Sequence, residues 1–138
     1  IPMSTAASSS RYAVGQLWQC KGRSDEERPT VLINRIDEHP MGGHIFHVTL
    51  DNLRIRNPHA PGGIQTRMAH APITAPTLDY SEPTLIGERE IDPAYLEGYG
   101  QWKQAFDAGN AGAFGNTVAA ITTIIEKQIN GIPNIPPR

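Results

Sequence analysis

The sequence predicts an α+β protein, in which an antiparallel sheet of about four strands is followed by two longer helices and one short helix packed on one face. Three observations predict this class. In the first half, short apolar segments are joined by links rich in Pro, Gly and charged residues, which is typical of consecutive antiparallel strands. In the second half, apolar residues recur at helical spacing. The length of 138 residues fits a single domain.

Four segments of the first half have the alternation and composition of strands. They are residues 12–20, 30–36, 45–50 and 53–56. The links 21–29 and 37–43 are predicted as turns, because they contain charged residues, Pro and a Gly-Gly pair. Residues 57–72 show no periodic pattern. We therefore expect a long loop there, a kind of segment that is often functional.

Two of the three helices are predicted from their ends and their apolar spacing. A short helix over residues 75–81 is capped by Thr74 and limited by Pro83. The last helix is capped by Asn116 and ended by Gly131. Its apolar stripe consists of Val118, Ile121, Ile125 and Ile129.

The middle helix carries an aromatic stripe. Asp92 followed by Pro93 predicts its start, and Gly109 predicts its end. The stripe consists of Tyr95, Tyr99, Trp102 and Phe106. We expect this face to cover the sheet, with Trp102 and Phe106 buried and the two tyrosines at the edge of the interface.

The chain is expected to form one domain over residues 12–131, between a disordered lead (1–11) and a Pro-rich tail (132–138). No apolar run approaches the ~18 residues that a membrane helix needs. No signal peptide is visible, so we expect a cytoplasmic location, or a periplasmic one if a signal peptide was removed before residue 1. Cys20 is the single cysteine, and we expect it to be a small buried apolar residue rather than a catalytic thiol.

Charge is distributed unevenly between the two halves. Residues 1–70 hold eight basic and six acidic groups, whereas residues 71–138 hold four basic and eight acidic groups. Such a division permits electrostatic steering of a charged partner. The pI of about 6.2 and the lack of a Lys/Arg block argue against nucleic-acid binding.

Three segments together resemble a group of small bacterial proteins. They are residues 15–18 (GQLW), 53–58 (LRIRNP) and 97–109 (EGYGQWKQAFDAG), of which the last is the most specific. The resemblance covers about residues 12–130, with departures at Ala69, where the group tends to have Gly, and at Pro83. It implies a single intact domain and no particular activity.

The histidines are candidates for metal ligands and for catalytic groups. His39, His44 and His47 lie close in sequence, but residues three apart on a strand point to opposite faces, so neither a metal site nor any other cofactor is predicted. His59, Arg67 and His70 share the predicted loop, where a His general base and an anion-clamping Arg are an alternative basis for a small enzyme or a ligand-binding protein. No nucleophile elbow, paired carboxylates or phosphate loop accompanies them.

The first hypothesis for function is a small non-catalytic module that binds a protein partner. An immunity-type inhibitor of a bacterial toxin or effector is one concrete form of it. The small size, the missing catalytic motif and the uneven charge of the two halves favour this hypothesis over an enzyme. The candidate binding residues are Arg54, Arg56, His59, Arg67, His70, Glu88, Glu90 and Glu97.

Overall fold

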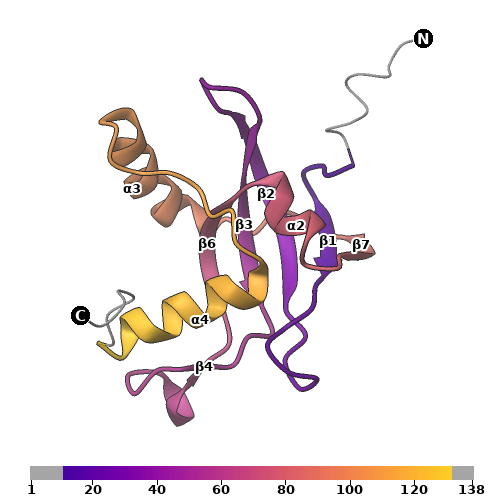
Figure 1. Ribbon diagram of the computed structural model, residues 1–138, viewed down its shortest axis with the longest axis vertical. Coiled ribbons are helices and arrows are strands. Elements are labelled where there is room, and N and C mark those ends of the chain that lie inside the picture. The colour runs from indigo at the N-terminus through magenta and orange to yellow at the C-terminus, as the bar shows by residue number, and fades with distance from the viewer. Residues whose placement is uncertain (1–10, 132–138) are drawn as a thin grey trace.

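The computed structural model describes residues 11–131, and their fold is the predicted α+β class (Figure 1). The main antiparallel sheet has the order β6-β3-β2-β1-β7. Its strands are β1 Gln16–Gln19, β2 Thr30–Glu38, β3 His44–Asp51, β6 Met68–Ile73 and β7 Thr84–Glu88. A two-stranded sheet pairs β4 Ile55–Arg56 with β5 Ile64–Gln65 across the 3-10 turn η1 Pro61–Gly63. The helices are α2 Ala75–Asp79, α3 Tyr95–Asp107 and α4 Val118–Ile129.

The expected long loop over residues 57–72 is wrong in its second part. Met68–Ile73 forms β6, which pairs with β3 at one edge of the main sheet. Pro72 suggested a loop because proline cannot donate a backbone hydrogen bond, but an edge strand tolerates proline. The expected fourth strand (53–56) is confirmed as the short β4, yet it pairs with β5 and not with the main sheet. The edge strand β7 was not predicted.

A bulge in β2 decides which side chains face which layer. The pairing of β2 with β3 shifts register between Ile33 and Arg35, so Asn34 is the extra residue. Before the bulge, Val31 and Ile33 face the apolar core. After it, Arg35 and Asp37 lie opposite His47 and Ile45 on the other face. A simple alternation along residues 30–36 would have kept all odd-numbered residues on one face.

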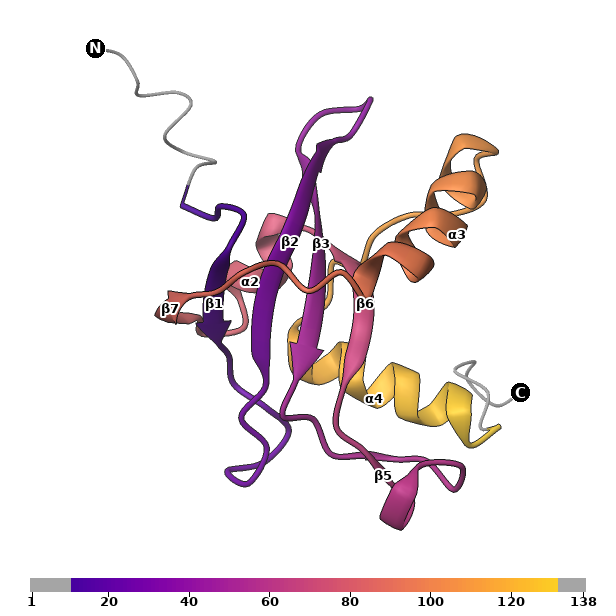
Figure 2. The ribbon, with the colours of Figure 1, turned by 180° about the vertical axis from the view of Figure 1, so that it is seen from behind.

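The helices do not share one face of the sheet, which corrects that part of the prediction. Figures 1 and 2 show α2 and α4 over one face, where Leu78 and Ile121 join the core with Phe46 and Val48. Helix α3 lies near β6 and packs on the opposite face through contacts with His47. The chain reaches α3 after β7, at the far edge of the sheet, by a segment that crosses this second face (Figure 2).

The ends of the two longer helices differ slightly from the prediction. Asp92 lies before a turn that precedes α3, where its Oδ1 accepts a hydrogen bond from Ala94 N at 2.9 Å, and the N-cap residue itself is Ala94. Thr117, not Asn116, caps α4, and its hydroxyl accepts from Ala120 N at 3.2 Å. Gly109 follows α3 with a left-handed φ of 81°, as its predicted role as a stop requires.

Burial on α3 differs from the expectation at three of the four aromatic residues. Tyr95 is 4% exposed, whereas Trp102 and Phe106 are only half-buried. The reason is that α3 covers the β6 side of the sheet from its N-terminal end, and its later turns extend past the sheet (Figure 1). None of the helices within residues 11–131 is long and apolar enough to cross a membrane. The predicted lead (1–11, apart from Arg11) and the tail (132–138) lie outside the described residues.

Candidate functional site

The most elaborate polar arrangement is a cluster between the sheet and α3, here called the His47 cluster: Arg35, Asp37, His47, His70 and Tyr99. His47 is fully buried, and its Nδ1 lies 2.9 Å from His70 Nε2 while its Nε2 lies 3.1 Å from Asp37 Oδ2. Tyr99 donates its hydroxyl to Asp37 Oδ2 at 3.0 Å. Arg35 Nε donates to Asp37 Oδ1 at 2.9 Å. Four elements therefore meet at one carboxylate and two imidazoles.

The protonation states in the His47 cluster follow from burial and hydrogen bonding. Burial lowers the pKa of His47 to about 4, and it also lowers the pKa of His70. Burial raises the pKa of Asp37, but the bonds from Tyr99 and Arg35 outweigh it, so that pKa is lowered overall. Near neutral pH, both imidazoles are therefore neutral beside an ionised carboxylate. A consistent set of tautomers has His70 Nε2–H donating to His47, and His47 Nε2–H donating to Asp37.

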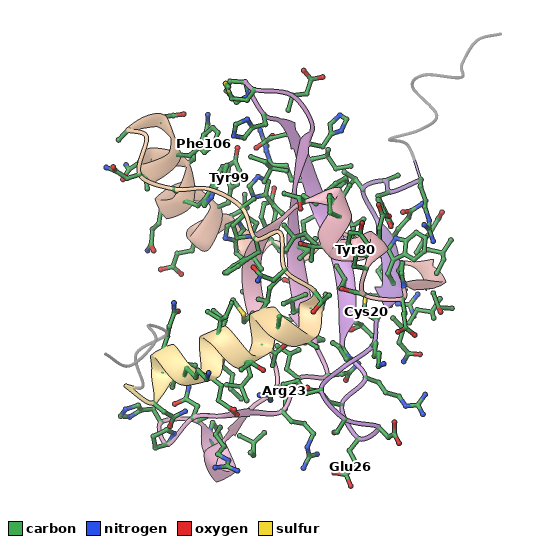
Figure 3. The ribbon with its side chains drawn as sticks, in the orientation of Figure 1. Cys20, Arg23, Glu26, Tyr80, Tyr99 and Phe106 are labelled. Carbon is green, nitrogen blue, oxygen red and sulfur yellow. The ribbon has the colours of Figure 1, made fainter. Side chains whose placement is uncertain are left out.

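Close packing surrounds these groups. A Cβ added at Gly98 would lie 2.8 Å from His70 Cβ, so glycine permits this turn of α3 to approach β6. The Trp102 ring meets His47 at a centroid distance of 4.6 Å and stacks on Phe106 at the same distance. Figure 3 shows Tyr99 and Phe106 on the side of α3 that faces the sheet. Because both ring nitrogens of His47 are used, the cluster holds α3 in place and offers no free general base at this residue.

We expect Trp102→Ala to lower the free energy of unfolding by about 1.5 kcal/mol, less than the ~3–5 kcal/mol of a fully buried tryptophan. The half-buried ring loses its contacts with His47 and Phe106 and its hydrogen bond from Nε1 to Gly112 O. Urea denaturation measures the change, with the exposed Leu96→Ala as the control on the same helix. A loss above about 3 kcal/mol would show that α3 is buried as deeply as the sequence suggested.

A second polar arrangement, the Glu27 cluster, consists of Arg23, Glu27 and Glu126. Glu27 is 2% exposed and accepts from Arg23 Nε at 3.0 Å and from Arg54 N at 2.7 Å. Glu126 on α4 accepts from Arg23 Nη1 at 2.9 Å and from Arg56 N at 2.7 Å. These bonds tie the loop after β1, strand β4 and α4 to each other. A Cβ at Gly22 would lie 2.0 Å from Glu27 O, so this loop requires glycine there.

The predicted residues of the 57–72 segment take separate places. His59 is exposed in the turn between β4 and β5, where its N–H donates to Asn57 Oδ1. Arg67 pairs with Asp51 at 2.9 Å and with Asp92, and thereby ties the start of β6 to the segment before α3. His70 lies inside the His47 cluster. The three residues predicted as an alternative catalytic set therefore make three unrelated sets of contacts.

The predicted acidic residues are also divided. Glu88 ends β7 and Glu90 follows it at the free edge of the sheet, whereas Glu97 lies on α3, beside β6 at the opposite edge. All three side chains are exposed and form no ion pair among residues 11–131. Arg54, just before β4, is likewise exposed, and so is Arg56 on β4.

The remaining histidines and the cysteine have simple environments. His39 Nδ1 accepts from Met41 N at 2.9 Å in the turn between β2 and β3. Within the described part of the chain, no group of three or more His, Cys, Asp or Glu side chains is placed to hold a metal ion. Cys20 is buried, as expected, and burial raises the pKa of its thiol to about 12. The thiolate that a nucleophile requires is therefore disfavoured.

Sequence reasoning missed several residues that organise these clusters. The sequence places Asp37 in a predicted turn, and no local pattern singles out Asn34 or Glu27. Asn34 is buried and bonds Thr49 on β3 and the N–H of Asp92 before α3. One usable signal was His47, a polar residue inside an apolar strand, because a buried histidine needs partners for its ring nitrogens.

No protein family, curated protein or solved structure that was compared with the chain matches it. Function is therefore inferred from the described residues alone.

Proposed function

We propose that the protein is a small module that binds a protein partner along the free edge of β7. The observation that carries the proposal is a pair of exposed apolar side chains on this strand. Leu85 and Ile86 are 49% and 44% exposed, and they lie at a bulge, because the register of β7 with β1 shifts between Leu17 and Trp18. β7 is the last strand of the sheet, and among residues 11–131 no strand pairs with its outer side. Such an edge accepts an added strand through its unpaired backbone groups.

The charge around the edge indicates the kind of partner. Glu88 and Glu90 form no ion pair among the described residues, and Lys21 is paired with Glu82. Arg89 donates to the Glu88 carbonyl and keeps its charge, so residues 88–90 carry one net negative charge. Two free carboxylates thus accompany the apolar side chains. We infer a partner that presents an extended segment with apolar residues and flanking Lys or Arg. An immunity-type inhibitor of a bacterial toxin is one form that such a module takes.

The binding proposal is preferred over the enzyme alternative because of where the alternative residues lie. His59, Arg67 and His70 contact different parts of the fold. Every buried side-chain nitrogen or oxygen within residues 11–131 has a hydrogen-bond partner. A catalytic set needs side chains that converge on one place, and these three residues do not.

We expect Ile86→Lys to abolish binding, because a lysine on an edge strand opposes strand addition. The matched control is Leu96→Lys, at a similarly exposed apolar residue on α3. Affinity capture from a lysate of the native organism, followed by mass spectrometry, identifies proteins retained by the wild type and by the control. Binding rates are then measured with the purified partner. A partner retained equally by Ile86→Lys would exclude β7 as the docking edge.

The acidic residues are expected to affect the association rate. Neutralising Glu88 and Glu90 together to Gln should slow association several-fold at low salt, with a smaller effect near 1 M salt, where the screening length falls to ~3 Å. Glu97→Gln serves as the control, because Glu97 lies beside the opposite edge of the sheet. Stability should stay within about 0.5 kcal/mol for each change. An unchanged rate in the double variant would contradict steering by this edge.

A further inference from the structure

A pocket lies where β4 meets α4 and the loop after β1. Figure 1 shows β4 and α4 on a different part of the molecule from β7. Its volume is about 390 Å³, within the ~300–1,000 Å³ range of small-molecule sites. The side chains that line it include Arg23, Glu27, Arg54, Arg56, Ile64 and Glu126. The protein-binding proposal makes no use of this pocket.

The two carboxylates of the pocket already have hydrogen-bond partners within the protein. Glu27 and Glu126 share the guanidinium of Arg23 and accept the backbone N–H groups of Arg54 and Arg56. Burial raises the pKa of each carboxyl, but the bonds from Arg23 and the backbone outweigh it and lower both pKa values. Arg23 is also hydrogen-bonded within the protein, since its Nη2 donates to Arg54 O at 2.7 Å in addition to the bonds with the two glutamates. Arg23 and the two glutamates together therefore form the rigid floor of the pocket.

Arg54 and Arg56 are the groups left free in this pocket. Ile55 between them is fully buried, so the alternation of the chain turns both arginines to the exposed side. Neither side chain has an ion pair or hydrogen bond with any residue of the described chain. Their backbone N–H groups are held by the floor, so the two side chains start from fixed positions. With three arginines and two glutamates in the lining, the pocket has a net positive charge.

We propose that this pocket binds a small phosphorylated molecule, with the phosphate held between the guanidinium groups of Arg54 and Arg56. A guanidinium donates two parallel hydrogen bonds to phosphate oxygens, and two such groups match the double negative charge of a phosphomonoester. The volume exceeds the needs of a phosphate group alone, so the rest of the ligand lies over Ile64. A nucleotide and a sugar phosphate both have this chemistry.

Calorimetry and NMR titration of the full chain test the proposal with pyrophosphate, AMP and ribose 5-phosphate as probes. At about 0.15 M salt, where exposed charges are screened beyond ~8 Å, we expect pyrophosphate to bind with a Kd of about 1 mM. The Nε–H signals of Arg54 and Arg56 should shift on titration. Tighter binding of AMP than of ribose 5-phosphate would assign the ligand to the nucleotides, and the reverse order to the sugar phosphates.

The double variant Arg54→Gln/Arg56→Gln should weaken pyrophosphate binding by about tenfold or more. It keeps the backbone bonds to Glu27 and Glu126, so the thermal midpoint should stay close to that of the wild type. The matched control, Lys103→Gln/Lys127→Gln, removes the same charge from exposed helix positions outside the pocket. The proposal is overturned if the control loses as much affinity as the double variant, or if about 10 mM pyrophosphate shifts neither Nε–H signal.

Discussion

Replacing Glu27 by Ala is expected to lower the free energy of unfolding by about 3–5 kcal/mol, because removing the buried carboxylate leaves its donors on Arg23 and Arg54 without this acceptor. The carboxylate is 2% exposed. It accepts hydrogen bonds from the backbone and side chain of Arg23 and from Arg54 N. After the change, the N–H of Arg54 lacks its acceptor and Arg23 retains only Glu126 as an acidic partner. Urea denaturation measures the loss.

The neighbouring Glu26 provides a matched control, since it is an exposed residue of the same loop (Figure 3). Glu26→Ala should change stability by no more than about 0.5 kcal/mol. Glu27→Gln keeps the side-chain volume and one acceptor oxygen, so its loss of stability should fall between the losses of the other two variants. If Glu27→Ala costs less than about 1 kcal/mol, the cluster does not hold the loop, β4 and α4 together as described.

The second large effect is a loss of stability as pH falls from neutrality towards about 4. In the folded chain the pKa of His47 is lowered from 6.5 to about 4 by burial and by His70. Between these values the unfolded chain binds more protons than the folded chain, so the free energy of unfolding rises with pH and falls with acidification. Over the whole range between these two pKa values, His47 alone changes the free energy of unfolding by about 3 kcal/mol. His70, whose pKa is also lowered by burial, adds to the loss in the same direction.

The charged and titratable neighbours of His47 determine how sharp this effect is. Asp37 and Arg35 face it from β2, His70 from β6 and Tyr99 from α3. Asp37 stays ionised and favours the imidazolium, but burial and the second imidazole oppose it more strongly. Between pH 7 and 5, above the range in which the carboxyl groups titrate, His47 alone should account for about 2 kcal/mol.

Denaturation curves at pH 7, 6 and 5 test this expectation. His47→Gln should reduce the pH dependence between these values, even though the variant is less stable at every pH. His59→Gln, a change of an exposed histidine in the turn between β4 and β5, should leave the pH dependence unchanged. A wild-type stability that is flat from pH 7 to 5 would mean that the two imidazoles are not buried together in the folded protein.

Much of the fold follows from local patterns in the sequence. A β-branched, apolar composition located the strand at 30–36. Alternating apolar residues located the strand at 45–50, since a half-buried strand repeats every two residues. The aromatic and Ile-rich stripes located α3 and α4, because helices bury residues at a spacing of three or four. The burial of Cys20 and the end of α3 at Gly109 could also be predicted from the sequence. These features depend on a residue and its near neighbours in the chain.

The candidate sites were much less accessible to such reasoning. The Pro and Gly content predicts a loop over 57–72, and strand β6 within it is not predicted, because Pro72 is tolerated only at the edge position that pairing with β3 creates. In the sequence, nothing distinguishes Glu27 from the other charged residues of its loop. Its importance comes from Arg54 and Glu126, on β4 and α4, and no local pattern indicates that these segments meet.

The α+β class, the order of most elements and the two apolar helix stripes follow from the amino-acid sequence, because hydrophobic spacing and end-capping residues act locally. Which polar groups come together depends on the tertiary structure. The bulge at Asn34 turns Asp37 towards His47, β6 adds His70, and α3 closes over them with Tyr99. A one-residue change of register reverses the face of every later side chain in a strand, and such a shift depends on contacts with distant segments rather than on neighbouring residues.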